Sequence, residues 1–235
     1  MGVNDTKWFQ SYLTARQQLV NVNGVDSELL NITCGVPQGS ILGPLLFLCY
    51  VNDMSISINS DCKLLLYADD STIIFSHKSP DVISTKLGEE LESCSDWLVD
   101  NNISLHLGKT ECNIFGPKRK LKKVSNFEVK CNDHIIKSQP KLKYLIIDID
   151  QNLSEQSTAN SIIKKVNARL KFMYRKANCL SSETRKTLSM ALIQCHFDYS
   201  CSSWYAGVSQ KLKNSLQVAQ NKTVRFINNE GPRSS

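Results

Sequence analysis

The segment LLLYADDSTIIF, residues 64–75, constrains the fold more than any other part of this sequence, because Asp69 and Asp70 interrupt two apolar runs. An unpartnered carboxylate loses several kcal/mol when it is desolvated, so strand interiors normally exclude it. The segment therefore predicts a hairpin whose exposed turn is Asp-Asp-Ser. Two interpretations of that turn remain open: an ordinary solvated turn, or a rigid tip whose paired acids hold Mg²⁺.

The composition is that of a globular protein. The chain has 235 residues, 41% hydrophobic and 21% charged, which suffices for one large domain or two small ones with a buried core. Its longest apolar run, 41–51, is too short to span a bilayer, and no secretory signal is evident. Nine cysteines without a Cys-x-x-Cys pair indicate free thiols in a reducing compartment. We expect an intracellular protein of the cytoplasm, the nucleus or both, without a membrane span.

The charges are distributed unevenly. Residues 1–117 hold 6 Lys and Arg against 14 Asp and Glu, whereas residues 118–235 hold 22 against 8. An acidic half that could collect divalent metal, followed by a basic half that could bind a polyanion, is typical of a nucleic-acid enzyme. The plainer alternative is a solvated basic face without a partner.

Local patterns in the first half predict several elements. A helix should include Trp8 to Leu13, and a hairpin should turn at Asn23-Gly24. The sequence CGVPQGS predicts a turn, and the apolar run 41–54, with Pro44 near its start, predicts a buried helix. Ser79 and Pro80 should open a helix to about Asn101. Its apolar stripe consists of Ile83, Leu87, Leu91, Cys94 and Leu98, and the acids Glu89, Glu90, Glu92 and Asp96 lie largely off that stripe.

The second half is predicted as strands followed by helices. Alternation over 103–116 indicates a half-buried strand, and short strands are expected over 127–149. The charge run 118–123 is the expected subdomain junction. Beyond it, a stripe of Ile162, Val166, Leu170, Met173 and Ala177 marks one helix. A second should begin near Ser181 or Ser182 with Leu188, Ala191, Leu192 and Cys195 on its apolar face, and a third should carry Leu212, Leu216, Ala219 and Ile227.

The order of the motifs is more specific than any one of them. A GVPQGS turn and apolar helix (35–54), YADD (67–70), NNISLHLGKTE (101–111) and KYLIIDID (143–150) follow one another. In this order they resemble motifs B, C, D and E of the reverse transcriptases of non-LTR (LINE-type, jockey- or CR1-like) retrotransposons. The resemblance implies RNA-directed DNA polymerisation with an RNA template, a DNA primer and deoxynucleoside triphosphates.

The resemblance also implies residue roles. Phosphoryl transfer to a primer hydroxyl uses two Mg²⁺ ions, for which carboxylates on a rigid turn are suitable ligands. Asp69 would be the principal catalytic metal ligand and Asp70 the supporting acid. Gln38, Gly39 and Tyr67 would lie beside the incoming nucleotide and primer end, and Lys109 would assist the departing pyrophosphate. Each also has a plain structural interpretation as a turn, strand or surface residue.

The basic helix of the last third would bind the phosphates of the nucleic acid. Its candidate contacts are Lys164, Lys165, Arg169, Lys171, Arg175 and Lys176. The implied fold is α+β: residues 1–117 form a partial palm with an antiparallel sheet and flanking helices and carry motifs B, C and D. Residues 118–153 form the end of the palm with primer-grip-like strands, and residues 154–235 form a helical, basic, thumb-like region.

Two departures from the family pattern matter. The family's motif A acid and its fingers region have no counterpart in this chain, where Asp5 lies in a polar stretch without a strand pattern. We therefore expect the isolated chain to be truncated and inactive. Ile146 replaces the usual glycine of motif E, and a β-branched residue adopts φ > 0 only at a cost. The alternative function is a non-catalytic nucleic-acid-binding remnant of a retroelement; a purely structural module would leave the motif order unexplained. Protein partners are not indicated.

Overall fold

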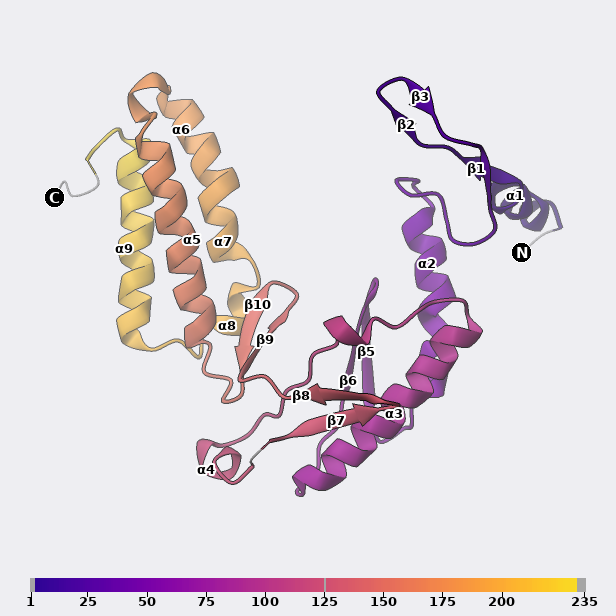
Figure 1. The fold of residues 1–235 in the computed structure, drawn as a ribbon. Coiled ribbons are helices and arrows are strands. Elements are labelled where there is room, and N and C mark those ends of the chain that lie inside the picture. Colours follow the sequence, from indigo (N-terminus) through magenta and orange to yellow (C-terminus); the bar gives the residue numbers. More distant parts are fainter. Residues whose placement is uncertain (1–2, 125, 232–235) are drawn as a thin grey trace. The chain divides into compact units, whose positions relative to one another are not determined.

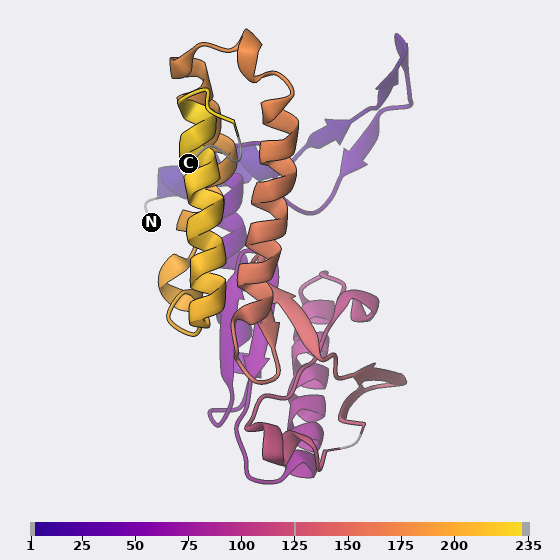
Figure 2. The same cartoon turned by 90° about the vertical axis from the view of Figure 1, so that its left-hand side faces the viewer.

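Short antiparallel strand pairs and longer helices make up this protein, as Figures 1 and 2 show. The computed structural model describes residues 3–124 and 126–231, and it confirms the expected α+β class. Within those residues the strands form five separate two-stranded antiparallel pairs rather than one larger sheet. The chain forms two units, Met1–Lys78 with Lys86–Leu105, and Ser79–Thr85 with His106–Ser235. The charge run 118–123, expected at a junction, lies inside the second unit. The predicted functional division at 117–118 and 153–154 stays a prediction.

The first unit begins with a helix and two nested strand pairs. Helix α1 (Val3–Leu13) contains the predicted aromatic residues. Strand β1 (Arg16–Gln18) pairs with β4 (Leu30–Ile32), and β2 (Asn21–Val22) pairs with β3 (Val25–Asp26). Asn23 and Gly24 both have positive φ, 53° and 84°, which type I′ turns require. The hairpin predicted from Asn-Gly is therefore confirmed.

The apolar run after the PQG turn forms helix α2 (Gly43–Val51), which continues as the 3-10 helix η1 (Asn52–Ser57). Pro44 lies in its first turn, as predicted. The prediction of a buried helix is wrong within the described residues, because Leu45 is 57% and Leu48 is 48% exposed. Apolar composition alone does not determine which face is covered, and here Met54 of η1 provides the core residue.

The predicted hairpin of residues 64–75 is present as β5 (Lys63–Tyr67) and β6 (Asp70–Ile74). Tyr67 pairs with Asp70, so the two-residue turn is Ala68-Asp69, not Asp-Asp-Ser. Asp70 and Ser71 belong to the second strand. Leu64, Leu66 and Ile73 pack against a buried cluster of Met54, Cys94 and Leu98. The strands are therefore held by apolar packing on one face.

Helix α3 (Pro80–Asp100) follows the predicted bounds closely. Cys94 and Leu98 of the predicted stripe are buried, but so is Glu90, at 3% exposed. The prediction that Glu90 lies off the buried face is wrong. Its Oε1 lies 2.8 Å from Lys86 Nζ and its Oε2 accepts from the Asn59 amide at 2.8 Å. Burial of this carboxylate is tolerated because both oxygens have partners.

The stretch 103–116, which begins in the first unit and continues into the second, does not form the predicted strand. It contains a 3-10 turn, η2 (Leu107–Lys109), and a single bridge from Cys112 to Ser138. The alternation of apolar and polar residues was misleading here, because within the described residues this stretch pairs with another segment only at that single bridge. Helix α4 (Lys118–Leu121) is followed by the short strands expected over 127–149. They form two hairpins, β7 (Glu128–Cys131) with β8 (His134–Lys137), and β9 (Lys141–Tyr144) with β10 (Ile147–Asp150).

A helical bundle completes the second unit, with α5 (Gln156–Tyr174) and α9 (Gln210–Ile227) side by side in Figures 1 and 2. Between them in sequence lie η3 (Ala177–Cys179), α6 (Ser182–Ser189), α7 (Cys195–Asp198) and α8 (Cys201–Trp204). All five residues of the predicted α5 stripe are buried. The core of this bundle includes Val166, Ile193 and Phe226, each of which is 0% exposed.

Of the second predicted stripe of the bundle, Leu188 packs against the core as expected, but Ala191, Leu192 and Cys195 are exposed, so the prediction is wrong for those three residues. Residues Met190–Gln194 form a π-helix, η4, between α6 and α7. Ser189, Ile193 and Phe197 are buried, whereas Leu192 is 40% exposed. Arg185 is also buried at 7% and donates to the carbonyls of Ala177, Leu180 and Ile227. Sequence periodicity missed this face because two of its buried positions, 185 and 189, are polar.

Candidate functional site

The two aspartates of the YADD segment lie at an exposed hairpin tip. Asp69 occupies the second turn position and Asp70 the first position of β6, and both are exposed. Ala68 before them has φ +52°, a conformation in which glycine is usual. Tyr67, 65% exposed, pairs with Asp70 across the hairpin. The structure therefore brings Tyr67, Asp69 and Asp70 together on a tip whose strands are anchored in the first core.

The PQG turn presents Gln38 and Gly39 at the surface of the same unit. Gly39 has φ +77°, which a side chain would adopt only with strain. Ser40 closes the turn, because its Oγ donates to the Pro37 carbonyl at 2.7 Å and accepts from the Gly43 amide at 3.0 Å. A Cβ on Gly43 would lie 2.9 Å from that Oγ. Gly39 and Gly43 are thus required for two different geometric reasons.

Arg16 of β1 contacts the segment just before this turn, a role that sequence reasoning missed. Its Nη2 donates to the carbonyl of Gly35 and, at 3.3 Å, to that of Cys34, while its Nε donates to Leu13. Through these bonds one side chain connects the end of α1 to the segment that precedes PQG. A lone arginine at the start of a short strand carries no local signal of this role, since its acceptors lie 18 and 19 residues away.

Lys109, the predicted pyrophosphate residue, is exposed in η2 of the second unit, whereas Asp69 and Asp70 belong to the first.

The acids of the motif E segment, Asp148 and Asp150, form interactions with residues close to them in the sequence. Asp148 lies 2.9 Å from Lys141 Nζ. Burial raises the pKa of Asp150, but hydrogen bonds from Ser154 and Asn152 and the nearby Lys118 outweigh it, so this pKa lies below its ordinary value. Asp150 therefore caps the turn after β10.

The hairpin tip carries donor atoms of the type that a divalent metal requires. Two adjacent exposed carboxylates offer the hard oxygen ligands that Mg²⁺ prefers, and Mg²⁺ commonly uses one or two protein carboxylates with water and substrate phosphates. The tip fits that requirement for ligand type. Over residues 3–124 and 126–231, no cluster of three or more His, Cys, Asp or Glu side chains suited to a metal is present. Asp5 lies in helix α1, not in a strand.

The six predicted phosphate contacts lie on α5 and just beyond its end. Spacings of seven and four residues place side chains on one face of a helix. Lys164, Lys171 and Arg175 therefore share the side of α5 opposite the buried stripe. Lys165, Arg169 and Lys176 share a second face, which borders the stripe. All are exposed except Arg169, which is half-buried. Its Nη1 donates to the Leu192 carbonyl at 2.5 Å and contacts His196 Nε2. Burial, Arg169 and Lys165 lower the pKa of His196, which favours the neutral ring.

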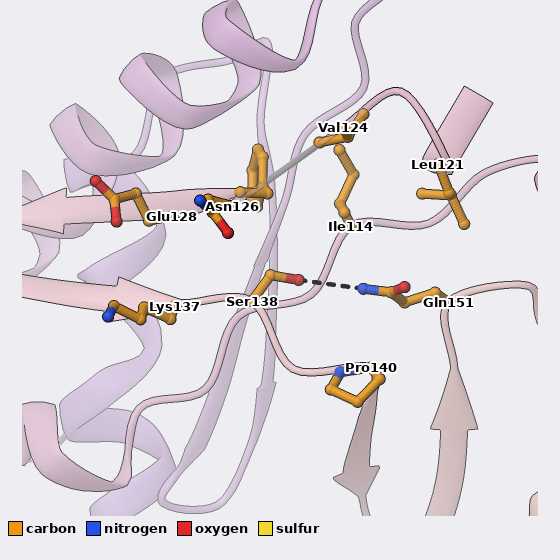
Figure 3. Close-up of a pocket in the computed structure, with 10 residues that line it drawn as sticks. Ile114, Leu121, Val124, Asn126, Glu128, Lys137, Ser138, Pro140 and Gln151 are labelled. Atoms are coloured by element: carbon orange, nitrogen blue, oxygen red, sulfur yellow. Dashed lines mark hydrogen bonds between the residues drawn. The ribbon is translucent and has the colours of Figure 1, made fainter.

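Two cavities lie within the second unit. One, of about 410 Å³, is lined by residues of α4, β7, β8 and the following loop, where Gln151 Nε2 donates to Ser138 Oγ (Figure 3). None of the predicted site residues lines it. The other, of about 230 Å³, is lined by Ile146, Lys165, His196 and Tyr199 among others. This cavity lies between the motif E turn, which contributes Ile146, and the basic helix α5, which contributes Lys165. Tyr199, which follows α7, contacts the same turn, because its Oη donates to the Leu145 carbonyl at 2.8 Å.

A glycine turn leading into an apolar helix, followed by paired acids on a hairpin tip, is the arrangement of a nucleotidyl-transferring polymerase palm. The chain belongs to the reverse transcriptase (RNA-dependent DNA polymerase) family, whose sequence model matches residues 1–149. Enzymes of this family act on a nucleic-acid template with deoxynucleoside triphosphates and generally depend on a divalent metal.

Similar proteins include RNA-directed DNA polymerases from transposons and mobile elements of Drosophila melanogaster. The chain is 26% identical to a probable RNA-directed DNA polymerase from transposon X-element and 26% identical to that from mobile element jockey, over 93% of its own length. It is 27% identical to a third, from transposon BS. The non-LTR resemblance drawn from the motif order is thereby confirmed. The chain spans about a quarter of each relative's length. No solved structure matches it.

None of the helices described over 3–124 and 126–231 is both long and apolar enough to cross a bilayer.

Proposed function

We propose that this chain is the part of a non-LTR retrotransposon reverse transcriptase that carries motifs B to E and the thumb. In the whole protein it would serve RNA-directed DNA synthesis with an RNA template, a DNA primer and deoxynucleoside triphosphates. The observation that carries the proposal is the exposed Asp69-Asp70 tip, anchored through Leu64, Leu66 and Ile73 in a chain of this family.

In this proposal the residues have distinct roles. Asp69 and Asp70 would hold two Mg²⁺ ions together with further ligands from the whole enzyme, and the metal would activate the primer hydroxyl and stabilise the leaving pyrophosphate. Tyr67 would position the primer end, and Gln38 and Gly39 would contact the incoming nucleotide. Lys109 would donate a proton to, or neutralise, the departing pyrophosphate. That residues 1–235 alone are inactive remains an expectation.

The metal role can be tested at the tip itself. In the isotope-labelled chain, Mn²⁺ should broaden the amide resonances of residues 67–71, and Mg²⁺ should compete for the site. Adding a template–primer and a matching deoxynucleoside triphosphate should increase the broadening, because the phosphates supply further oxygen ligands. Asp69→Asn should reduce the effect, since it removes a charged ligand.

A matched control is available at the β7–β8 hairpin. Asp133 lies in its turn and is exposed, but it has no neighbouring acid. Mn²⁺ should broaden that turn less, and Asp133→Asn should leave the 67–71 resonances unchanged. Equal broadening at both turns, or no response to Asp69→Asn, would mean that the YADD tip is an ordinary solvated turn. Nucleic-acid binding without metal at the tip would favour the alternative function, a non-catalytic binding remnant.

A further inference from the structure

Phe172 lies on the outer surface of α5 with 69% of its surface exposed. The helix buries Ile162, Val166 and Leu170 on its other side, so its packing into the bundle does not use Phe172. Placing a large aromatic ring in water forgoes the burial that normally stabilises it. A single exposed ring is common on protein surfaces and gains meaning only from what surrounds it.

The surroundings of Phe172 are cationic. Residues three and four positions away share its face of a helix, which places Arg169 and Arg175 beside it, with Lys176 next along the chain. Arg175 still has helical dihedrals, φ −63° and ψ −22°. The whole segment 156–176 has six Lys and Arg and no Asp or Glu.

These cations are not neutralised within the protein. The ion pairs of the described ranges, 3–124 and 126–231, involve Lys86 and Lys141 but no residue of α5. Any partner that covers Phe172 must therefore be accommodated among positive charges that have no acidic partner in the described ranges. An apolar protein surface would desolvate those charges without compensation, whereas a nucleic acid supplies both an aromatic face and phosphates.

We propose that Phe172 is a stacking platform for an unpaired base of a single-stranded nucleic acid, whose flanking phosphates are contacted by the cations around it. The proposal rests on the proposed function, in which the thumb that contains α5 would bind the nucleic acid, and it adds to that function one contact residue and a preference for unpaired bases. A paired base within a continuous duplex has both faces covered by its neighbours, so the ligand is a single strand or a frayed end. Stacking accepts any base, so binding should be nearly indifferent to sequence.

The central experiment compares Phe172→Ala with wild type for binding of a fluorescent 12-nucleotide oligouridylate over a range of salt concentrations. Loss of one stacked base should weaken binding about 5- to 150-fold. The log–log salt slope should stay unchanged, because no phosphate contact is removed. Arg175→Ala should instead reduce the slope by about 0.7. Phe115→Ala, which removes an exposed phenylalanine outside α5, should bind as wild type does.

The ligand can be altered in the same way as the protein. An oligonucleotide of the same length made of abasic sites keeps the phosphates but offers nothing to stack. Wild type should bind it as weakly as Phe172→Ala binds the oligouridylate, and Phe172→Ala should cause no further loss. A blunt duplex should also be bound equally by wild type and variant. In Phe172→Trp, single-strand binding should quench the added tryptophan fluorescence.

The outcomes distinguish failure of the stacking proposal from failure of nucleic-acid binding by α5. Salt-dependent binding that weakens in Arg175→Ala but not in Phe172→Ala would overturn the stacking proposal and leave the basic helix as a binding surface. The stacking proposal would also be overturned if Phe172→Ala weakened binding of the abasic and the normal strand equally, or if Phe172→Trp showed no quenching. Wild type that binds no oligonucleotide in a salt-dependent manner would refute nucleic-acid binding by α5 itself. Unchanged circular dichroism of Phe172→Ala should confirm that the variant folds.

Discussion

The turn between β9 and β10 contains a strained isoleucine whose replacement should stabilise the protein. Tyr144 pairs with Ile147, so Leu145 and Ile146 form a two-residue turn, and their φ values are +43° and +76°. Left-handed backbone costs an ordinary residue about 1–2 kcal/mol, and strained positions reach about 3 kcal/mol. Ile146→Gly should release about 2–3 kcal/mol, because a β-branched residue is among the least tolerant of positive φ.

Two costs oppose that gain. Glycine has greater freedom in the unfolded chain, which costs about 0.5–1 kcal/mol. Ile146 is 59% exposed, so the glycine variant loses under half of a buried isoleucine's contribution, about 1 kcal/mol. The net expectation is a gain of between about 0 and 1.5 kcal/mol, centred near 0.75 kcal/mol. Unfolding in urea should be followed by the fluorescence of Trp204, which is buried in this unit, with Trp8 and Trp97 changed to Phe.

Ile135→Gly is the matched control for this prediction. Ile135 is 54% exposed in β8 and has no positive φ, so the same change brings the costs without the relief of strain. It should destabilise the protein by about 1.5–2 kcal/mol. The difference between the two variants, about 2–3 kcal/mol, measures the strain at Ile146. Equal destabilisation by both substitutions would refute the reasoning.

Two further predictions follow from titratable groups in the second unit. Because burial, Arg169 and Lys165 hold the pKa of His196 below its ordinary value, the unfolded chain takes up a proton near pH 6.5 while the folded chain does not, so stability should fall as the pH drops from 7.5 to 5.5. His196→Gln should show a smaller drop in melting temperature over that range, and an identical drop would contradict this account. Burial raises the pKa of Cys112 to about 11, so at pH 8 only about one thiol in a thousand is ionised. Peptide mass spectrometry after iodoacetamide treatment should find Cys112 modified far more slowly than exposed Cys179, and comparable rates would show that burial does not protect it.

The sequence was most informative where one pattern determined one structure. The Asn23-Gly24 turn, the YADD hairpin and the buried stripe of α5 each combine a strong local preference with packing that agrees with it. The motif order identified the family because four short segments at set spacings exclude coincidence better than any single one. Gln38, Gly39, Tyr67 and the two acids could be named from these segments alone.

Other features depended on partners distant in the sequence. Glu90 is buried because Lys86 and the Asn59 amide satisfy it, and Asn59 lies 31 residues away. Arg185 is buried because carbonyls at the ends of η3 and α9 converge on it. The stretch 103–116 alternates as a strand would, but a ladder also needs a neighbour, and periodicity does not report one.

The π-helix at Met190–Gln194 determines the rotational setting of α7, which continues directly from it. Each residue of an α-helix turns the chain by about 100°, so one residue more or fewer at this point would rotate α7 by that angle about its axis. Phe197 would then leave the core, and His196 would leave Arg169. Single-residue insertions and deletions here are therefore under a stricter constraint than substitutions. Sequence comparisons of this region should place gaps outside 190–194 even where the amino acids themselves have diverged.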